Sequence, residues 1–426
     1  MLKNTPDQVG LTPRKGFPVW QNSASRWPVV LPVLLIVLSG CAGRPEGVLR
    51  PIALSTNDTN RVDMLVATTR KQAADAGELY TGERGTAISL NSITVSIPPD
   101  GSRKIGEVQW PRRLPANPEK EFAVLEVEKI ATERQAHTWF RENANAKKQV
   151  IIFVHGFNNT YADAVFRFAQ ITHDAGTNAT PILFTWPSRA SAFGYLYDKE
   201  STNYSRRALE DIIIQTARSP DVGDITILAH SMGTWLAVEA LRGVAMREKA
   251  IPAKVKNVVL ASPDIDVDVF RRQLIEMGKK RPQFTIFAST KDRALEVSRW
   301  ISGGVNRVGG IDAAPYTSVL KQLGITVIDT STVASKDALG HNAFADSPEI
   351  IGLLGKRLAG QSLEGGSVSL TDHLGIAAIK TADLAGSAAR TIVAAPIAVV
   401  SPEARKILQQ DRSGGTVKLV DGEISY

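Results

Sequence analysis

A strand that turns abruptly into a helix constrains the fold more than any other feature of this chain. Ile225–Leu228 is an apolar run that favours a β-strand, and Leu236–Leu241 is an amphipathic helical pattern. A tight corner joins them, and the small residues Ala229 and Gly233 flank Ser231 at its tip. Such a corner points a serine hydroxyl into open space beside the positive end of a helix. The sequence therefore predicts a serine positioned for nucleophilic attack.

Strand and helix patterns alternate on both sides of this corner. The strand Val150–Val154 is apolar throughout, which is typical of a sheet buried on both faces. Further strands are predicted at Pro181–Thr185, Ile225–Leu228, Val255–Ala261, Phe284–Ala288 and Ile325–Ile328, and helices at Ala162–Ala175, Ser205–Ala217, Thr234–Glu248 and between the strands ending at Ala261 and beginning near Phe284. This alternation predicts an α/β fold with a doubly wound, mostly parallel sheet.

Different patterns flank this alternating region. Extra strands are predicted at Val62–Thr69, Ile88–Ile97 and Phe122–Ile130, followed by a helix at Thr132–Asn145. Residues 61–358 are therefore expected to form one α/β domain. Beyond Ala359 the chain is rich in small residues without a core pattern, so residues 359–426 are expected to be a tail that is partly ordered at best.

The N-terminal region has the pattern of an export signal. Basic residues precede a short apolar run at 28–38, which is shorter than the roughly 20 residues of a membrane span. Leu38–Cys41 follows directly and resembles a bacterial lipobox, in which the cysteine is lipidated. We expect a signal peptide over 1–40, a lipidated tether over 41–60 and membrane attachment through Cys41. A plain signal peptide cut near Ala42, or a buried helix, is the alternative.

Residue 42 and the charge pattern suggest a location and exclude some partners. Ala42 is not the aspartate that retains many such lipoproteins at the inner membrane, which favours the outer membrane of a bacterium. The net charge of +7 is spread along the chain, so it predicts scattered surface charge and no nucleic-acid partner. No metal-ligand spacing or phosphate loop occurs, so neither a metal nor a cofactor is expected. The sequence makes no prediction of oligomeric state.

A second loop is expected beside the serine corner. His155–Asn158 directly follows the buried strand Val150–Val154, and strand ends of a parallel sheet gather at one edge. Gly156 lets the backbone approach closely, so amides of this loop are able to point at a developing oxyanion. An ordinary strand-to-helix turn is the alternative interpretation.

A general base and an acid must reach Ser231 from loops at the same sheet edge. His341 follows the last predicted strand and fits this requirement, whereas His373 in the tail fits it less well. Asp292 follows the strand ending at Ala288, and Asp264 follows the preceding strand. Aspartate is common after strands for structural reasons alone, so these residues leave both acids open.

These motifs together resemble a known family. Val154-His155-Gly156-Phe157, Ala229–Gly233, Asp292 and Leu339-Gly340-His341 are similar to the oxyanion loop, nucleophile elbow, acid and base of the α/β-hydrolase superfamily, in its chain order of serine, acid and histidine. With the stretch from Val62 to Trp110, the chain resembles a bacterial esterase/lipase-like branch, domain of unknown function 900, from Val62 to Leu358. Ala229 departs from the glycine usual in the elbow motif.

The resemblance implies a mechanism. Ser231 would be the nucleophile of an esterase or lipase-like enzyme, and His341 its base. Asp292 would orient that base in preference to Asp264, and the amides of Met232 and Phe157 would hold the oxyanion. The expected substrate is a small-molecule or lipid ester, cleaved through an acyl-enzyme. An acyltransferase, a thioesterase or peptidase, and a non-catalytic surface lipoprotein with this fold are the alternatives.

The substrate pocket is harder to predict. No large cap fits between the strands ending at Ala261 and beginning near Phe284, so the site is expected to be open. The segment from Trp186 to Tyr204, between the predicted strand Pro181–Thr185 and the predicted helix Ser205–Ala217, is rich in aromatic residues. These side chains would wall an acyl pocket, or would only cover the sheet edge. Its candidate substrate-binding residues are Trp186, Phe193, Tyr195 and Tyr197.

Overall fold

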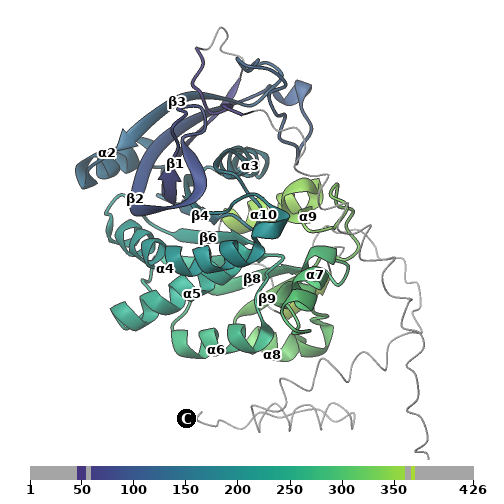
Figure 1. The fold of residues 1–426 in the computed structure, drawn as a ribbon. Helices are drawn as coiled ribbons and strands as arrows, with labels where there is room; N and C mark the ends of the chain where they lie inside the picture. The colour runs from purple at the N-terminus through teal and green to yellow at the C-terminus, as the bar shows by residue number, and fades with distance from the viewer. Residues whose placement is uncertain (1–45, 54–58, 360–365, 370–426) are drawn as a thin grey trace, which may run out of the picture. The chain divides into compact units, whose positions relative to one another are not determined.

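A computed structural model describes residues 46–53, 59–359 and 366–369 of the chain (Figure 1). The predicted signal peptide, with Cys41 as its lipidation site, lies outside the described residues, as do His373 and most of the predicted tail. The lipid anchor therefore stays a prediction. In the described part of the chain, no helix combines the length and apolar character that crossing a membrane requires.

The core of the fold is a ten-stranded sheet with the order β10-β9-β8-β7-β6-β4-β5-β1-β2-β3 among the described residues. The strands are β1 (Asn60–Gln72), β2 (Tyr80–Ile97), β3 (Ala123–Ile130), β4 (Val150–Val154), β5 (Thr180–Thr185), β6 (Ile225–His230), β7 (Val255–Ala261), β8 (Gln283–Ala288), β9 (Ile325–Asp329) and β10 (Gly366–Ser369). Neighbours from β10 to β1 are parallel, whereas β1–β2 and β2–β3 are antiparallel. The predicted mostly parallel sheet with extra N-terminal strands is confirmed.

Helices cover both faces of this sheet (Figure 1). They are α2 (Glu133–Asn143), α3 (Tyr161–Asp174), α4 (Tyr195–Arg218), α5 (Met232–Glu248), α6 (Val267–Met277), α7 (Arg293–Ile301), α8 (Thr317–Gln322), α9 (Ala343–Asp346) and α10 (Pro348–Leu358). Side chains of β4 alternate between two buried clusters: Ile152 packs with α4, α5 and α6, and Phe153 packs with α3 and α10. The apolar run of this central strand therefore reflects burial on both faces.

Residues at both ends of the domain extend it beyond the predicted limits. Leu49, which falls in the predicted tether, is fully buried, and its amide donates to the carbonyl of Gly77 at 3.0 Å. Residues 46–53 therefore pack on the domain and are not a free tether. At the other end β10 lies in the predicted tail and pairs in parallel with β9.

Helix α4 begins ten residues before the predicted start at Ser205. Its first turns carry polar residues that a sequence pattern assigns to a loop, yet Asp198, Ser201 and Thr202 are buried. The Asp198 carboxylate accepts from the Ser188 hydroxyl, and the Ser201 and Thr202 hydroxyls donate to backbone carbonyls of α4 itself, so these polar side chains are paired although buried.

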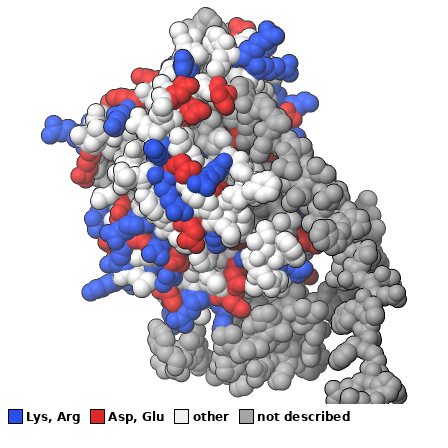
Figure 2. Space-filling view, viewed as in Figure 1, with Lys and Arg blue, Asp and Glu red and all other residues white. Residues whose placement is uncertain are grey.

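Charge of both signs is mixed over the face of the molecule seen in Figure 2. Figure 2 shows Lys and Arg side chains interspersed with Asp and Glu over the face in view. Among the described residues, no group of three or more histidine, cysteine, aspartate or glutamate side chains has the geometry to hold a metal ion.

Candidate active site

Ser231 occupies a strained corner between β6 and α5. Its backbone has φ 52° and ψ −125°, a conformation that costs free energy for any residue with a side chain. The corner is held by hydrogen bonds from the Ser231 amide to the Ala261 carbonyl at 3.0 Å and from the Thr234 hydroxyl to the Ser231 carbonyl at 2.6 Å. The local sequence therefore forms the predicted strand-to-helix turn, with the serine at its tip.

Gly233 is required because the chain passes very close to the neighbouring strand. A Cβ at this position would lie 2.2 Å from the His155 carbonyl oxygen and 2.7 Å from the Val154 carbonyl oxygen. Both are backbone atoms of β4 and its following loop, so neither is free to move aside. The glycine lets α5 start directly against the loop that follows β4.

Gly233→Ala should destabilise the protein by about 3 kcal/mol, because the methyl group would overpack a site lined by backbone. The denaturant midpoint in a urea titration measures this change. Gly352→Ala is the matched control: Gly352 lies in α10, and a Cβ there would meet nothing within 4 Å. That control should leave the midpoint unchanged or raise it slightly. Equal midpoints for the two variants would contradict the proposed crowding.

The loop after β4 lies against Ser231 as predicted. A Cβ on Gly156 would be 2.9 Å from the Cβ of Ser231 and 2.8 Å from Nδ1 of His230, so only glycine fits. The backbone amides of Phe157 and Met232 donate no hydrogen bond to any described residue. Two unpaired N–H groups beside a serine are the donors that an oxyanion requires.

Arg70, at the end of β1, supports this loop from inside the fold. Its guanidinium is buried and donates to the Asn159 carbonyl at 2.8 Å, the Ser188 carbonyl at 3.0 Å and the Thr185 hydroxyl at 2.8 Å. Burial lowers the pKa of Arg70 to about 10, which leaves it charged at neutral pH. Sequence reasoning missed this residue, because nothing in its local pattern distinguishes it from an exposed arginine in a strand.

His155 is a structural part of the loop. Its Nε2 accepts the Trp186 amide at 3.1 Å, so Nδ1 carries the proton and donates to the Gly156 carbonyl at 2.8 Å. Burial first, and then the nearby Arg70, lowers the pKa of His155 to about 3. The imidazole is therefore neutral, and it stacks on the Trp186 ring with centroids 4.8 Å apart.

The structure joins His341 to Asp292. Nδ1 of His341 lies 2.7 Å from Oδ2 of Asp292, and both side chains are largely shielded from solvent. The other carboxylate oxygen of Asp292 accepts the Leu295 amide at 3.0 Å, which caps α7. Since Nδ1 donates to the carboxylate, Nε2 is left to accept a proton.

His341 packs against the elbow. Its carbonyl accepts from His230 Nε2 at 3.4 Å, and the two imidazole rings are 4.8 Å apart between centroids. Because His230 immediately precedes Ser231, this contact brings the His341 loop to the serine. Asp337 shapes the loop by accepting the amides of Leu339 at 2.7 Å and Asn342 at 2.6 Å.

The pKa values of His341 and His230 are shifted in opposite directions by their surroundings. Burial alone would lower the pKa of His341, but the charge and hydrogen bond of Asp292, with weaker help from Asp337 and Asp264, raise it above its usual value. Burial, together with the charge of His341, lowers the pKa of His230 well below its usual value. His341 is thus the stronger base of the pair.

Asp264, the alternative acid, has other partners. Its carboxylate accepts from Ser298 Oγ at 2.6 Å and Tyr195 Oη at 3.1 Å, and it pairs with Arg307 Nε at 3.2 Å. Its amide lies 3.3 Å from the Ser231 carbonyl oxygen. The structure therefore places Asp264 near the elbow but engaged away from His341.

The four aromatic residues predicted to line the pocket lie in different environments in the structure. Trp186 is fully buried behind the loop, and its Nε1 donates to the His155 carbonyl, so assigning it to substrate contact is wrong in this structure. Tyr197 lies against Arg189 and Glu83, away from the serine. Phe193 is 77% exposed.

Only Tyr195 touches the proposed site directly. Its ring packs edge-on against Phe157 with centroids 5.5 Å apart, and its hydroxyl bonds to Asp264 and Ser298. Between β7 and β8 the structure has the single helix α6, as the sequence spacing predicted.

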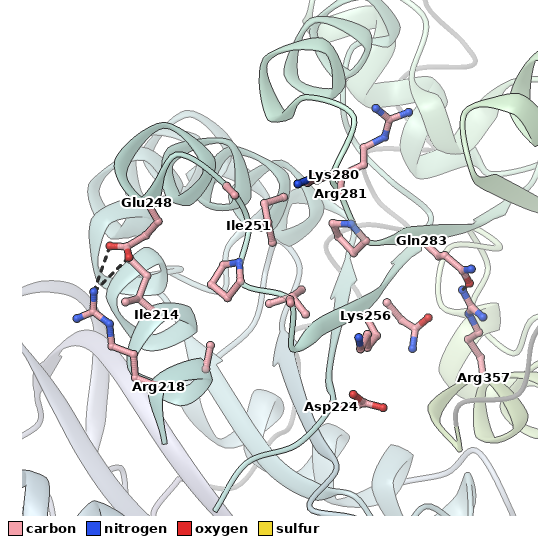
Figure 3. A pocket seen from close by; sticks show the side chains of 17 residues that line it. Ile214, Arg218, Asp224, Glu248, Ile251, Lys256, Lys280, Arg281, Gln283 and Arg357 are labelled. Atoms are coloured by element: carbon pink, nitrogen blue, oxygen red, sulfur yellow. Dashed lines mark hydrogen bonds and ion pairs between the residues drawn. The ribbon is translucent and has the colours of Figure 1, made fainter. Parts of the chain in front are cut away.

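A cavity of about 950 Å³ lies at the opposite edge of the sheet (Figure 3). It is lined by residues at the amino ends of strands, such as Val255 and Gln283, whereas Ser231 and Asp292 follow carboxyl ends. Its cations Arg218 and Arg357 occupy the last turns of α4 and α10, where positive charge offsets the helix dipole. This cavity is therefore separate from the proposed active site.

Comparisons with known proteins agree with this architecture. The sequence profile of a family described as "Alpha/beta hydrolase of unknown function (DUF900)" matches residues 132–357, which is more than half of the 426 residues. No curated protein matches the chain.

Several solved structures of esterases and hydrolases are similar at low identity. One is a chain from a structural analysis of two fungal esterases from Rhizomucor miehei, with 12% identity and a TM-score of 0.31 over 80% of this chain and 92% of that one. A lipase-esterase related protein from Clostridium acetobutylicum gives 12% and 0.26, over 51% and 97%. A siderophore hydrolase from Aspergillus nidulans gives 13% and 0.26, over 75% and 90%. Likeness at this level carries no argument about activity.

The family match covers the whole alternating region, from α2 to the last turn of α10. It includes the elbow, the loop after β4 and the His341–Asp292 pair. The chain therefore belongs to the family of alpha/beta hydrolases of unknown function, DUF900.

Proposed function

We propose that this protein is a serine hydrolase that cleaves carboxylic esters through an acyl-enzyme on Ser231. The observation that carries the proposal is the 2.7 Å contact between His341 Nδ1 and Asp292 Oδ2, in a loop packed against a strained serine corner. The unpaired amides of Phe157 and Met232 add the electrostatic part of the same machinery.

The first half of the reaction acylates the serine. His341 Nε2 takes the hydroxyl proton of Ser231 as Oγ attacks the carbonyl carbon of the ester, and the carbonyl oxygen becomes an oxyanion. The amides of Phe157 and Met232 donate to that oxyanion. The tetrahedral intermediate then expels the alcohol, which receives the proton from His341.

The second half releases the acid. Water attacks the acyl carbonyl while His341 takes its proton, and Ser231 leaves with that proton restored. Throughout, Asp292 holds the imidazole with its proton on Nδ1 and stabilises the imidazolium that forms transiently. The same acyl-enzyme would serve a transferase, a thioesterase or a peptidase. Esters are proposed because the motifs around Ser231, Asp292 and His341 resemble those of esterase/lipase-like α/β-hydrolases.

A fluorophosphonate probe tests this proposal directly. Protein beginning after Cys41 should gain the mass of one probe, and peptide mass spectrometry should place it on Ser231. Ser231→Ala should remain unlabelled, because the probe reacts only with an activated serine. Labelling of the variant as strongly as the natural protein, or labelling of neither, would contradict the proposal.

A further inference from the structure

Lys199 lies beside the proposed site without being part of the machinery described above. It follows Tyr195 by one helical turn on α4, and Tyr195 contacts the loop at Phe157. Its ammonium lies over the ring of Trp235, with Nζ 4.2 Å from the ring centroid. Trp235 itself is one turn along α5 from Ser231. Two independent elements therefore hold Lys199 next to the serine corner.

The ammonium of Lys199 has no anionic partner in the part of the chain that the structure describes. Among the described residues, no carboxylate oxygen lies within 4.0 Å of Nζ and no acceptor lies within hydrogen-bond distance. Two acids act on it electrostatically without forming an ion pair: Asp264 is bound by Arg307 and Ser298, and Asp266 caps α6 through the amides at its start.

Lys199 is partly shielded from solvent without an ion-pair partner among the described residues. Burial lowers the pKa of Lys199 to about 8, against a smaller opposing effect of Asp264. A partly desolvated ammonium that lacks a carboxylate is rare, because desolvation is normally offset by pairing. Contact with the Trp235 ring offsets only part of that loss. A ligand anion would supply the missing partner.

We propose that Lys199 binds a negatively charged group of the substrate, so that Ser231 acts on esters that also carry a carboxylate or a phosphate. The inference rests on the proposed function, because it places the anion next to the serine that is acylated. It also explains why α4 begins early: the added turns carry both Tyr195 and Lys199 to the corner.

Matched esters test the proposal. Mono-4-nitrophenyl glutarate and 4-nitrophenyl valerate have acyl chains of equal length, but only the glutarate carries a carboxylate. In a second pair, 4-carboxyphenyl valerate carries the carboxylate on its alcohol group and 4-carbamoylphenyl valerate carries a neutral amide there. For at least one pair, the anionic ester should have a kcat/KM higher by about tenfold or more, as expected for a charge-assisted hydrogen bond. Inorganic phosphate and free glutarate, added as competing inhibitors, distinguish the two classes of anion.

Variants assign that preference to the lysine. In Lys199→Met the ratio of kcat/KM for the anionic ester to that for the neutral ester should fall to about one, and Lys199→Arg should restore most of it. Lys256→Met is the matched control: Lys256 is exposed beside the cavity at the opposite sheet edge, and its removal should leave the ratio unchanged.

The pH dependence gives a second readout. Lys199 carries its charge below its pKa, so the anion preference should be full at neutral pH and decline as pH rises through about 8. The other charged groups that act on Lys199 are Asp264, Asp266 and Arg307. A preference that is constant from pH 6 to 9 would argue against Lys199 as its source.

The outcomes separate the two proposals. If Ser231 is labelled and neutral esters are cleaved, but no anion preference depends on Lys199, the inference about the lysine is wrong and the hydrolase proposal stands. If no ester is cleaved and Ser231 is not labelled, both fail. An anion preference that Lys199→Met abolishes and Lys256→Met retains supports both.

Discussion

Ser231→Ala should lower kcat for a 4-nitrophenyl ester by about 10⁵- to 10⁶-fold, the loss expected when the nucleophile of such a set is removed. The reason is that Ser231 is the residue at the strained corner between β6 and α5, near the amides of Phe157 and Met232 that donate to no described residue. The fold should tolerate the change, because no hydrogen bond of the Ser231 hydroxyl to a described residue is lost.

Steady-state kinetics measures this loss, and thermal unfolding checks the fold. Ser205→Ala is a suitable control, because Ser205 is also buried, and its hydroxyl bonds to Thr69 at 2.8 Å within the fold. That variant should keep kcat within a few-fold of the natural protein while losing some stability. A Ser231→Ala protein that retains more than about one hundredth of the activity would show that another residue is the nucleophile.

Asp292→Asn should lower kcat by about 10⁴-fold at neutral pH. The amide of asparagine is able to donate to Nδ1, which would leave the proton of His341 on Nε2, where the serine proton must go. The fold should survive, because asparagine is as good a helix N-cap as aspartate and retains an oxygen for the Leu295 amide.

The same substitution should shift the pH profile in a defined direction. In the natural protein, activity requires neutral His341 and therefore rises with pH through a pKa above the usual histidine value, because Asp292 stabilises the protonated form. Without that charge, burial still disfavours the imidazolium, so the inflection of kcat/KM should move to lower pH. Asp264→Asn discriminates the acids: a larger loss and a similar shift in that variant would make Asp264 the orienting acid.

Local sequence determined the elements that form the centre of the sheet. The apolar run of β4 and the alternation up to β9 predicted parallel strands, because burial on both faces leaves no polar positions in a strand. The strand-to-helix corner at Ser231 was also predicted from its local sequence. At Gly233 the small residue has a steric cause, because a Cβ there would lie 2.2 Å from the His155 carbonyl oxygen.

The local sequence pattern did not predict where α4 starts or where the aromatic side chains after β5 lie. Trp186, Tyr195 and Tyr197 lie within twelve residues, yet one is buried behind the loop, one touches the proposed site and one faces β2. Their spacing in the sequence does not distinguish these three environments. The chain changes direction between Trp186 and Tyr195 at η3 (Ala192–Gly194), and α4 then starts earlier than predicted.

The sequence by itself determined that a serine stands at a strand-to-helix corner and that histidine and aspartate follow later strands. Only the tertiary structure decided which of them meet: Asp292 reaches His341, whereas Asp264 pairs with Arg307. It alone showed that Arg70 is buried beneath the loop and that Lys199 forms no ion pair with any described carboxylate. Strand and helix patterns arise from neighbours along the chain, but charge partners come from segments far apart, whose approach the local pattern does not encode.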